Sequence, residues 1–278
     1  MTRPTSEQRH ALAPREGHET KSRPQAGVNS VEIAGVLLRT LSETADSARL
    51  ADLVRATGMP SAKIHRYLVS LIRAGLVEQD PGSSRYDLGP LALRAGIVAL
   101  SRSDTLKRAE RTLGTIVEQT GETAAAAVWG THGPTLVRLV EARHELASSV
   151  PLGHVCALTF SAVGLVYCAF ADPERIAPLA ERELAQSRAV GRPGAPRNRA
   201  ELDRLVADVR ARGFATIAYG GDGGLAAVSA PVFDSGGGRL RLALSVFGRV
   251  GRINVAPEGP VAALMVEAAR SLGAELHG

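Results

Sequence analysis

The sequence contains few cysteines and no long apolar run. Cys156 and Cys168 are the only cysteines among 278 residues, which excludes a disulfide-stabilised secreted scaffold and favours a reducing compartment. No run of about 18 apolar residues, long enough for a membrane-spanning helix, is present. The first residues also lack the pattern of a secretory signal. These absences predict a cytoplasmic protein with no membrane partner.

Sequence motifs that indicate catalysis or a bound cofactor are also missing. No G-x-S-x-G nucleophile elbow occurs. The glycine-rich run at 220–224 is followed by Leu225 and Ala226, where a phosphate-binding loop needs Lys and then Ser or Thr. His154 and Cys156 would point the same way from a strand, as in a metal site or a Cys/His pair, but no third ligand is nearby. We expect neither an enzyme nor a cofactor or metal.

Acidic residues are absent from position 53 to position 77. The wider segment 28–88 is balanced, with seven basic and seven acidic residues, so its net charge indicates nothing. The acid-free stretch carries the cations Arg55, Lys63, Arg66 and Arg73. Such a local positive face suits DNA phosphates and base edges. A solvated amphipathic helix has the same charge pattern. The turn residues and flanking segments are therefore needed to distinguish it from a DNA-binding helix.

Residues 48–76 have the pattern of two helices joined by a tight turn. Gly58 follows the first helix, where a left-handed backbone favours glycine, and Pro60 suits the first turn of the next helix. One face of that second helix is apolar and contains Ile64, Leu68, Leu71 and Ile72. The other face contains Ala62, His65, Arg66, Val69 and Arg73. This arrangement is typical of a DNA-reading helix-turn-helix.

Flanking segments complete a small domain. Upstream, an apolar-periodic helix is expected with the residues Val31, Val36, Leu37, Leu38 and Leu41. Downstream, the turn cluster DPGSS separates two short strands in residues 76–89, a hairpin of the kind called a wing. Together these elements predict a winged helix-turn-helix over residues 28–89. The polar residues 1–27 are expected to be a disordered tail.

The length of the chain predicts two domains rather than one. Residues 90–104 are expected to be a linker helix with a break at 101–104, and residues 105–275 a second domain. Helices are expected there at 158–170, 178–189, 199–212 and 261–272. Strands are expected around a hairpin turn at 130–134 and at 214–219, 226–233 and 240–247. Strands mixed with helices on one side predict an α+β fold with an antiparallel sheet.

The run ATGMPSAKIHRYLVSLIRAGLVEQDPGSSRYDLGPLAL resembles the DNA-binding domain of the IclR family of bacterial transcriptional regulators. The resemblance extends over residues 28–275, and segments 152–166 and 212–248 are similar to conserved blocks of the family's second half. It implies a GAF/PAS-like effector-binding domain after the winged helix-turn-helix. It also implies a regulator that binds a palindromic double-stranded DNA operator as a homodimer or homotetramer, with an affinity that a small-molecule effector changes.

The helix-turn-helix predicts where DNA would be contacted. The expected DNA-binding residues are Ser61, Ala62, Lys63, His65, Arg66 and Arg73, with Arg85 beside the turn of the wing. Arg66 or Lys63 would read guanine or contact phosphate. The helical connection at 91–117 is the candidate to transmit effector binding. The alternative is a ligand-sensing or protein-interaction module that does not bind DNA.

The resemblance also implies an effector pocket between the sheet and the helix that begins within 157–164. Carried over position by position, its lining would be Gly153, Thr159, Ser161, Asp222, Leu225 and Ser245. Thr159 and Leu165 stand where the family commonly has His and Lys, and Tyr219 and Gly220 where acidic residues are usual. Fewer ionisable groups favour a neutral or aromatic effector. Alternatively, Thr159 and Ser161 only cap a helix.

Overall fold

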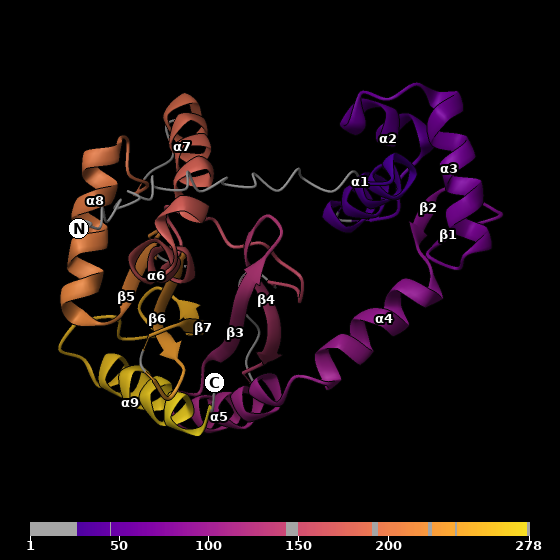
Figure 1. Cartoon of the computed structure of the whole chain (residues 1–278). Helices are drawn as coiled ribbons and strands as arrows, with labels where there is room; N and C mark the ends of the chain where they lie inside the picture. The colour runs from indigo at the N-terminus through magenta and orange to yellow at the C-terminus, as the bar shows by residue number, and fades with distance from the viewer. Residues whose placement is uncertain are drawn as a thin grey trace, which may run out of the picture. The chain divides into compact units, whose positions relative to one another are not determined.

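The computed structural model describes residues 27–44, 46–142, 150–190, 194–221, 224–236 and 238–276 (Figure 1). The predicted tail over residues 1–27 lies, apart from Gly27, outside the described residues. The chain divides into two compact units between Ala95 and Gly96. This boundary falls inside α4 (Pro90–Ser101), within the predicted linker. None of the helices in the described ranges is long and apolar enough to cross a membrane.

The first unit contains the predicted winged helix-turn-helix. Its elements are α1 (Asn29–Glu43), α2 (Leu50–Thr57), α3 (Ser61–Arg73), β1 (Val77–Gln79) and β2 (Tyr86–Leu88). Strands β1 and β2 pair antiparallel as the wing. The core consists of side chains from all of these elements, including Leu37, Leu41, Leu53, Ile64, Leu68, Leu71, Val77 and Tyr86.

The turn between α2 and α3 has the predicted backbone. Gly58 adopts the left-handed conformation at φ 67°, and its N–H donates to the carbonyl of Val54 at 2.9 Å. Pro60 directly precedes α3 as its N-cap instead of lying in its first turn. The wing is tied to the start of α2 because Ala48 and Tyr86 exchange backbone hydrogen bonds of 2.9 and 2.8 Å.

The predicted apolar face of α1 is partly wrong. Ile33, Leu37 and Leu41 are the buried residues, spaced four apart on one side of the helix. Val31 and Val36 lie away from that side and are 69% and 38% exposed. The apolar periodicity therefore predicts the helix correctly, but the predicted buried face differs from the observed one.

The second unit is an α+β domain built on a five-stranded antiparallel sheet. Its strands are β3 (Thr123–Gly130), β4 (Gly133–Val140), β5 (Ala215–Tyr219), β6 (Leu225–Phe233) and β7 (Leu240–Arg249). Their order across the sheet is β4-β3-β7-β6-β5. The helices are α5 (Asp104–Thr120), α6 (Ala162–Phe170), α7 (Pro173–Val190), α8 (Arg199–Arg212) and α9 (Pro260–Glu275).

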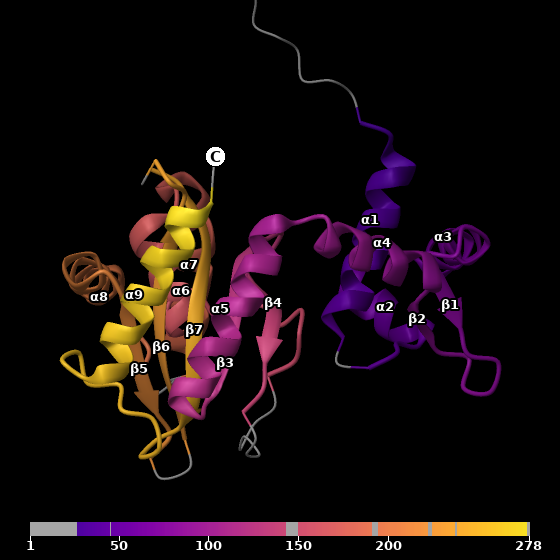
Figure 2. The same ribbon diagram turned by 90° about the horizontal axis from the view of Figure 1, so that it is seen from below.

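Helices cover both faces of this sheet, so the prediction of helices on one side was wrong (Figure 2). On β3, Ala125 and Ala127 face the core formed with α6, α7 and α8. Ala124 and Ala126 face the core formed with α5 and α9. The alternating side chains of the strand are thus apolar in both directions, as in a sheet buried on both faces.

Two helices, α6 and α7, begin several positions away from the predicted residue. α6 begins at Ala162 rather than at 158, because Ser161 caps it and the preceding residues form a loop. α7 begins at Pro173 rather than at 178, where the carboxylate of Asp172 accepts a hydrogen bond of 3.0 Å from the N–H of Glu174. The predicted break before α5 is confirmed.

Candidate DNA-reading helix and effector cavity

Helix α3 is fixed by its apolar side, which leaves its polar side exposed. Ile64, Leu68 and Leu71 are buried in the core of the first unit. The predicted DNA-binding residues Ser61, Ala62, His65, Arg66 and Arg73 are exposed, and Lys63 is half-buried. A helix held in this way can present its outer face to a groove of DNA.

The cations of α3 are not neutralised within the described part of the chain. Among the described residues, Lys63, Arg66 and Arg73 form no ion pair, whereas Arg55 on α2 pairs with Asp52 at 3.5 Å. The charge of the outer face of α3 is therefore available to an external anion such as a phosphate.

The wing contains a structured turn beside Arg85. The carboxylate of Asp80 accepts hydrogen bonds from the N–H of Ser83 at 2.6 Å and from its hydroxyl at 2.7 Å. These hydrogen bonds hold the pKa of Asp80 below its usual range. The half-buried Arg85 donates through one guanidinium nitrogen to the carbonyl of Ser47. Arg85 thus links the wing to the segment before α2, and only its remaining N–H groups would reach a phosphate.

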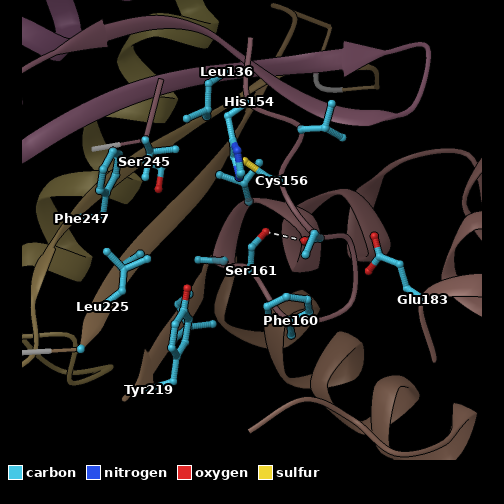
Figure 3. Close-up of a pocket in the computed structure, with 18 of the residues that line it drawn as sticks. Leu136, His154, Cys156, Phe160, Ser161, Glu183, Tyr219, Leu225, Ser245 and Phe247 are labelled. Atoms are coloured by element: carbon cyan, nitrogen blue, oxygen red, sulfur yellow. Dashed lines mark hydrogen bonds between the residues drawn. The ribbon is translucent and has the colours of Figure 1, made fainter. Parts of the chain in front are cut away.

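A cavity of about 920 Å³ lies in the second unit between the sheet and the helices α6 and α7 (Figure 3). The sheet side contributes Tyr219, Leu225, Ser245 and Phe247, and the helix side contributes Phe160, Ser161 and Glu183. Apolar and aromatic side chains predominate. Among the described residues that line the cavity there is no lysine or arginine.

The start of α6 forms one wall of the cavity. The hydroxyl of Ser161 accepts a hydrogen bond of 2.9 Å from the N–H of Gly164 and donates one of 2.5 Å to the carbonyl of Ala157. The expectation that Ser161 caps a helix is confirmed. It also lines the cavity, so the two roles are compatible.

Glu183 on α7 connects that helix to the loop before α6. Its Oε1 accepts a hydrogen bond of 2.8 Å from the N–H of Leu158. Its Oε2 accepts hydrogen bonds from Thr159, at 2.9 Å from the N–H and at 3.1 Å from the hydroxyl. Thr159 therefore does not cap α6: it is fully buried and holds Glu183.

Desolvation disfavours the charged forms of the two groups considered for chemistry. Burial raises the pKa of the Cys156 thiol to about 12. Partial desolvation lowers the pKa of His154 below its ordinary value of 6.5, although this side chain is exposed. Both side chains line the cavity, but no cluster of three or more His, Cys, Asp or Glu suited to a metal occurs in the described ranges.

Three of the residues expected to contact an effector, Ser161, Leu225 and Ser245, line this cavity. Gly153 does not, because it forms a turn at φ 83° whose N–H donates to the carbonyl of Leu136. Thr159 does not either, because it is buried behind the loop. Asp222 lies outside the described residues.

The cavity also has lining residues that were not predicted as effector contacts. They include His154, Cys156, Phe160, Glu183 and Phe247. Phe247 follows Ser245 by two positions on β7, so the alternation of a strand would have identified it. Glu183 lies on an amphipathic helix, where a carboxylate normally indicates a solvated face, and no sequence signal marks it.

Comparisons with known proteins identify relatives of both units. Residues 30–81 match the IclR helix-turn-helix domain, and residues 97–274 match the C-terminal domain of the bacterial transcriptional regulator IclR. The HTH-type transcriptional regulator BhcR of Paracoccus denitrificans is 28% identical over 223 residues, which cover 80% of this chain and 78% of that protein. These relatives are transcriptional regulators and not enzymes.

Two solved structures have the same fold. The crystal structure of Pseudomonas aeruginosa HmgR is 33% identical, with a TM-score of 0.54, and the match covers 90% of this chain and 98% of HmgR. An IclR homologue from Microbacterium hydrocarbonoxydans, crystallised with 4-hydroxybenzoate, is 18% identical, with a TM-score of 0.67. That match covers 89% of this chain and 98% of the homologue.

Proposed function

This chain belongs to the IclR family of bacterial transcriptional regulators, and we propose that it binds a palindromic DNA operator as a homodimer or homotetramer. A small molecule in the cavity of the second unit would change its affinity for that operator. The proposal rests on one observation: the apolar side of α3 is buried in the first unit, while its cationic side is exposed and forms no ion pair among the described residues.

In the proposed complex with DNA, α3 lies in the major groove. Arg66 is the candidate to read guanine through two parallel hydrogen bonds, and Lys63 the candidate to contact phosphate. Ser61, Ala62 and His65 are exposed on the same helix and would border the base edges. Arg73 at the end of α3 and the wing residue Arg85 would contact the backbone of the DNA.

The proposed oligomer is supported by α4. None of its residues is buried, although the helix is largely apolar. Leu91, Leu93 and Ile97 are 45%, 65% and 56% exposed. Leu93 and Ile97 are four positions apart and so lie on one side of the helix, and neighbouring exposed apolar side chains of this kind are typical of a surface that a protein partner covers. A second copy of the chain is the partner we propose, because a symmetric dimer also supplies a second reading helix for a palindromic site.

The proposed effector is a small uncharged or aromatic molecule. The cavity volume of about 920 Å³ is within the range of small-molecule sites. Phe160, Tyr219 and Phe247 offer aromatic surfaces, and Ser161 and Ser245 offer hydroxyl groups. We propose that the helical connection formed by α4 and α5 transmits effector binding, which requires that the effector bind the DNA-competent and DNA-incompetent arrangements with different affinity.

Fluorescence anisotropy with a labelled fragment of the intergenic DNA beside the gene tests the proposal. We expect Arg66→Ala to weaken binding by about tenfold to a hundredfold, since a bidentate base contact contributes about 1–3 kcal/mol. The matched control is Arg204→Ala, which removes an exposed cation from α8 in the other unit. Equal affinities of wild type and Arg66→Ala would reject α3 as the reading helix.

A further inference from the structure

Glu183 lines the cavity and carries a carboxylate that also binds the loop directly before α6. Both of its carboxylate oxygens accept hydrogen bonds, at 2.8 to 3.1 Å, from the N–H groups of Leu158 and Thr159 and from the Thr159 hydroxyl. These donors belong to the loop directly before α6, in which Leu158 and Thr159 are fully buried, whereas Glu183 itself lines the cavity. Backbone N–H groups near the start of a helix are a common binding site for anions. Here a side chain of the chain itself already fills that role.

The described lining of the cavity contains no lysine or arginine that could compensate a second negative charge. Partial desolvation lowers the pKa of His154, which disfavours its cationic form. The hydroxyl of Ser161 already bonds to Gly164 and Ala157. A ligand carboxylate would lose its hydration and lie in the same cavity as the Glu183 carboxylate without a cation, which is unfavourable.

We propose that Glu183 is a specificity-determining residue that excludes carboxylic acids from this cavity, so that the effector is an uncharged aromatic compound such as an ester, an amide or a lactone. The inference rests on the proposed function, since it takes this cavity to be the effector site. A cationic ligand is not required by the negative charge of Glu183, because three donors already stabilise that charge.

The test compares matched ligands that differ only in charge. Calorimetry with the full chain measures the affinities of 4-hydroxybenzoate, methyl 4-hydroxybenzoate and 4-hydroxybenzamide. For the wild type we expect the ester or the amide to bind at least about tenfold more tightly than the acid. An acid that binds as tightly as its ester would overturn the proposal, as would a failure of both uncharged compounds to bind.

Two variants test the role of Glu183 directly. Glu183→Gln keeps the size of the side chain, so we expect it to raise the affinity for 4-hydroxybenzoate by about tenfold and to change that for the ester by less than about threefold. Because this variant also weakens the contact between α7 and the loop, a second variant adds charge instead. Gln186→Lys places a cation on an exposed, cavity-lining position one helical turn from Glu183.

Gln186→Lys is expected to raise the affinity for the acid alone, and Gln186→Met is its uncharged control. A variant set in which acid and ester affinities always change together would overturn the proposal. Operator affinity is measured on the same wild-type preparation without ligand. If the wild type does not bind the operator, the proposed DNA binding is wrong. The ratio of acid affinity to ester affinity tests only the role of Glu183.

Discussion

Gly164 packs so closely against the loop before α6 that a Cβ on it would overlap the carbonyl oxygen of Leu158. It would also overlap the carbonyl oxygen of Ala157. Both obstacles are backbone atoms, so no side-chain rotation relieves the overlap. We expect Gly164→Ala to lower the free energy of unfolding by about 3 kcal/mol. Urea unfolding followed by circular dichroism measures this change.

Gly114 provides the matched control for that substitution. It lies within α5, and a Cβ on it would meet no atom within 4 Å. Because alanine restricts the unfolded chain and favours helix, Gly114→Ala should raise the free energy of unfolding by about 0.5–1 kcal/mol. Similar stabilities for the two variants would contradict the packing of α6 described above.

The first unit could be predicted well because its signals are local. Gly58 and Pro60 mark the turn between α2 and α3, and both act within a few residues of their place in the chain. Ile64 and Leu68 repeat at helical spacing and face the core. The buried face of α1 was predicted less well. Its apolar residues are compatible with more than one buried face, and only tertiary packing determines that Ile33 is buried and Val31 is exposed.

The cavity could be predicted only in part because its walls meet through long-range contacts. Ser161, Leu225 and Ser245 were expected from the resemblance to the IclR family, and the structure brings them together. Glu183 reaches Thr159 from a separate helix, 24 positions along the chain, so neither periodicity nor a motif could indicate the contact. The packing of α7 against the loop, which places the Glu183 carboxylate at the cavity, could not be predicted from the sequence either.

The apolar side of α4 gives a prediction about self-association. Leu93 is 65% exposed, so Leu93→Gln should leave the stability of the isolated chain nearly unchanged. If a second copy covers this face, the variant should shift the mass measured by light scattering toward the monomer and weaken operator binding. Leu205→Gln, at a 38% exposed position on α8, is the control. An unchanged mass for Leu93→Gln would place the oligomer interface elsewhere.

The two cysteines should be inert while the protein is folded. Burial raises the pKa of Cys156 and of Cys168 to about 12, so neither forms the reactive thiolate near neutral pH. We expect Ellman's reagent to react at about pH 8 only at the rate of unfolding. Cys168→Ala leaves the cavity-lining Cys156 as the single thiol. Rapid reaction of that variant in the folded state would show that the reagent enters the cavity.

The same pKa shifts make stability depend on alkaline pH. The folded-state pKa of about 12 lies above the ordinary thiol value of 9.0. The unfolded chain therefore loses its thiol protons first, and the stabilisation is complete below pH 9.0 and is lost as the pH rises toward 12. A double Cys→Ala variant should show a smaller decrease in the free energy of unfolding over this interval. An equal decrease would assign the alkaline effect to other groups.

Lys63 and Arg66 should contribute to DNA binding in different ways. Lys63 carries a compact charge in the first turn of α3, whereas Arg66 is exposed and has a planar group that matches guanine. Lys63→Ala should weaken binding to operator and scrambled DNA alike and reduce the slope of log Kd against log salt by about one. Arg66→Ala should weaken operator binding more than binding to scrambled DNA. Anisotropy titrations of both variants on both DNAs over a salt series separate the two effects, and equal losses on both DNAs for Arg66→Ala would make it a phosphate contact.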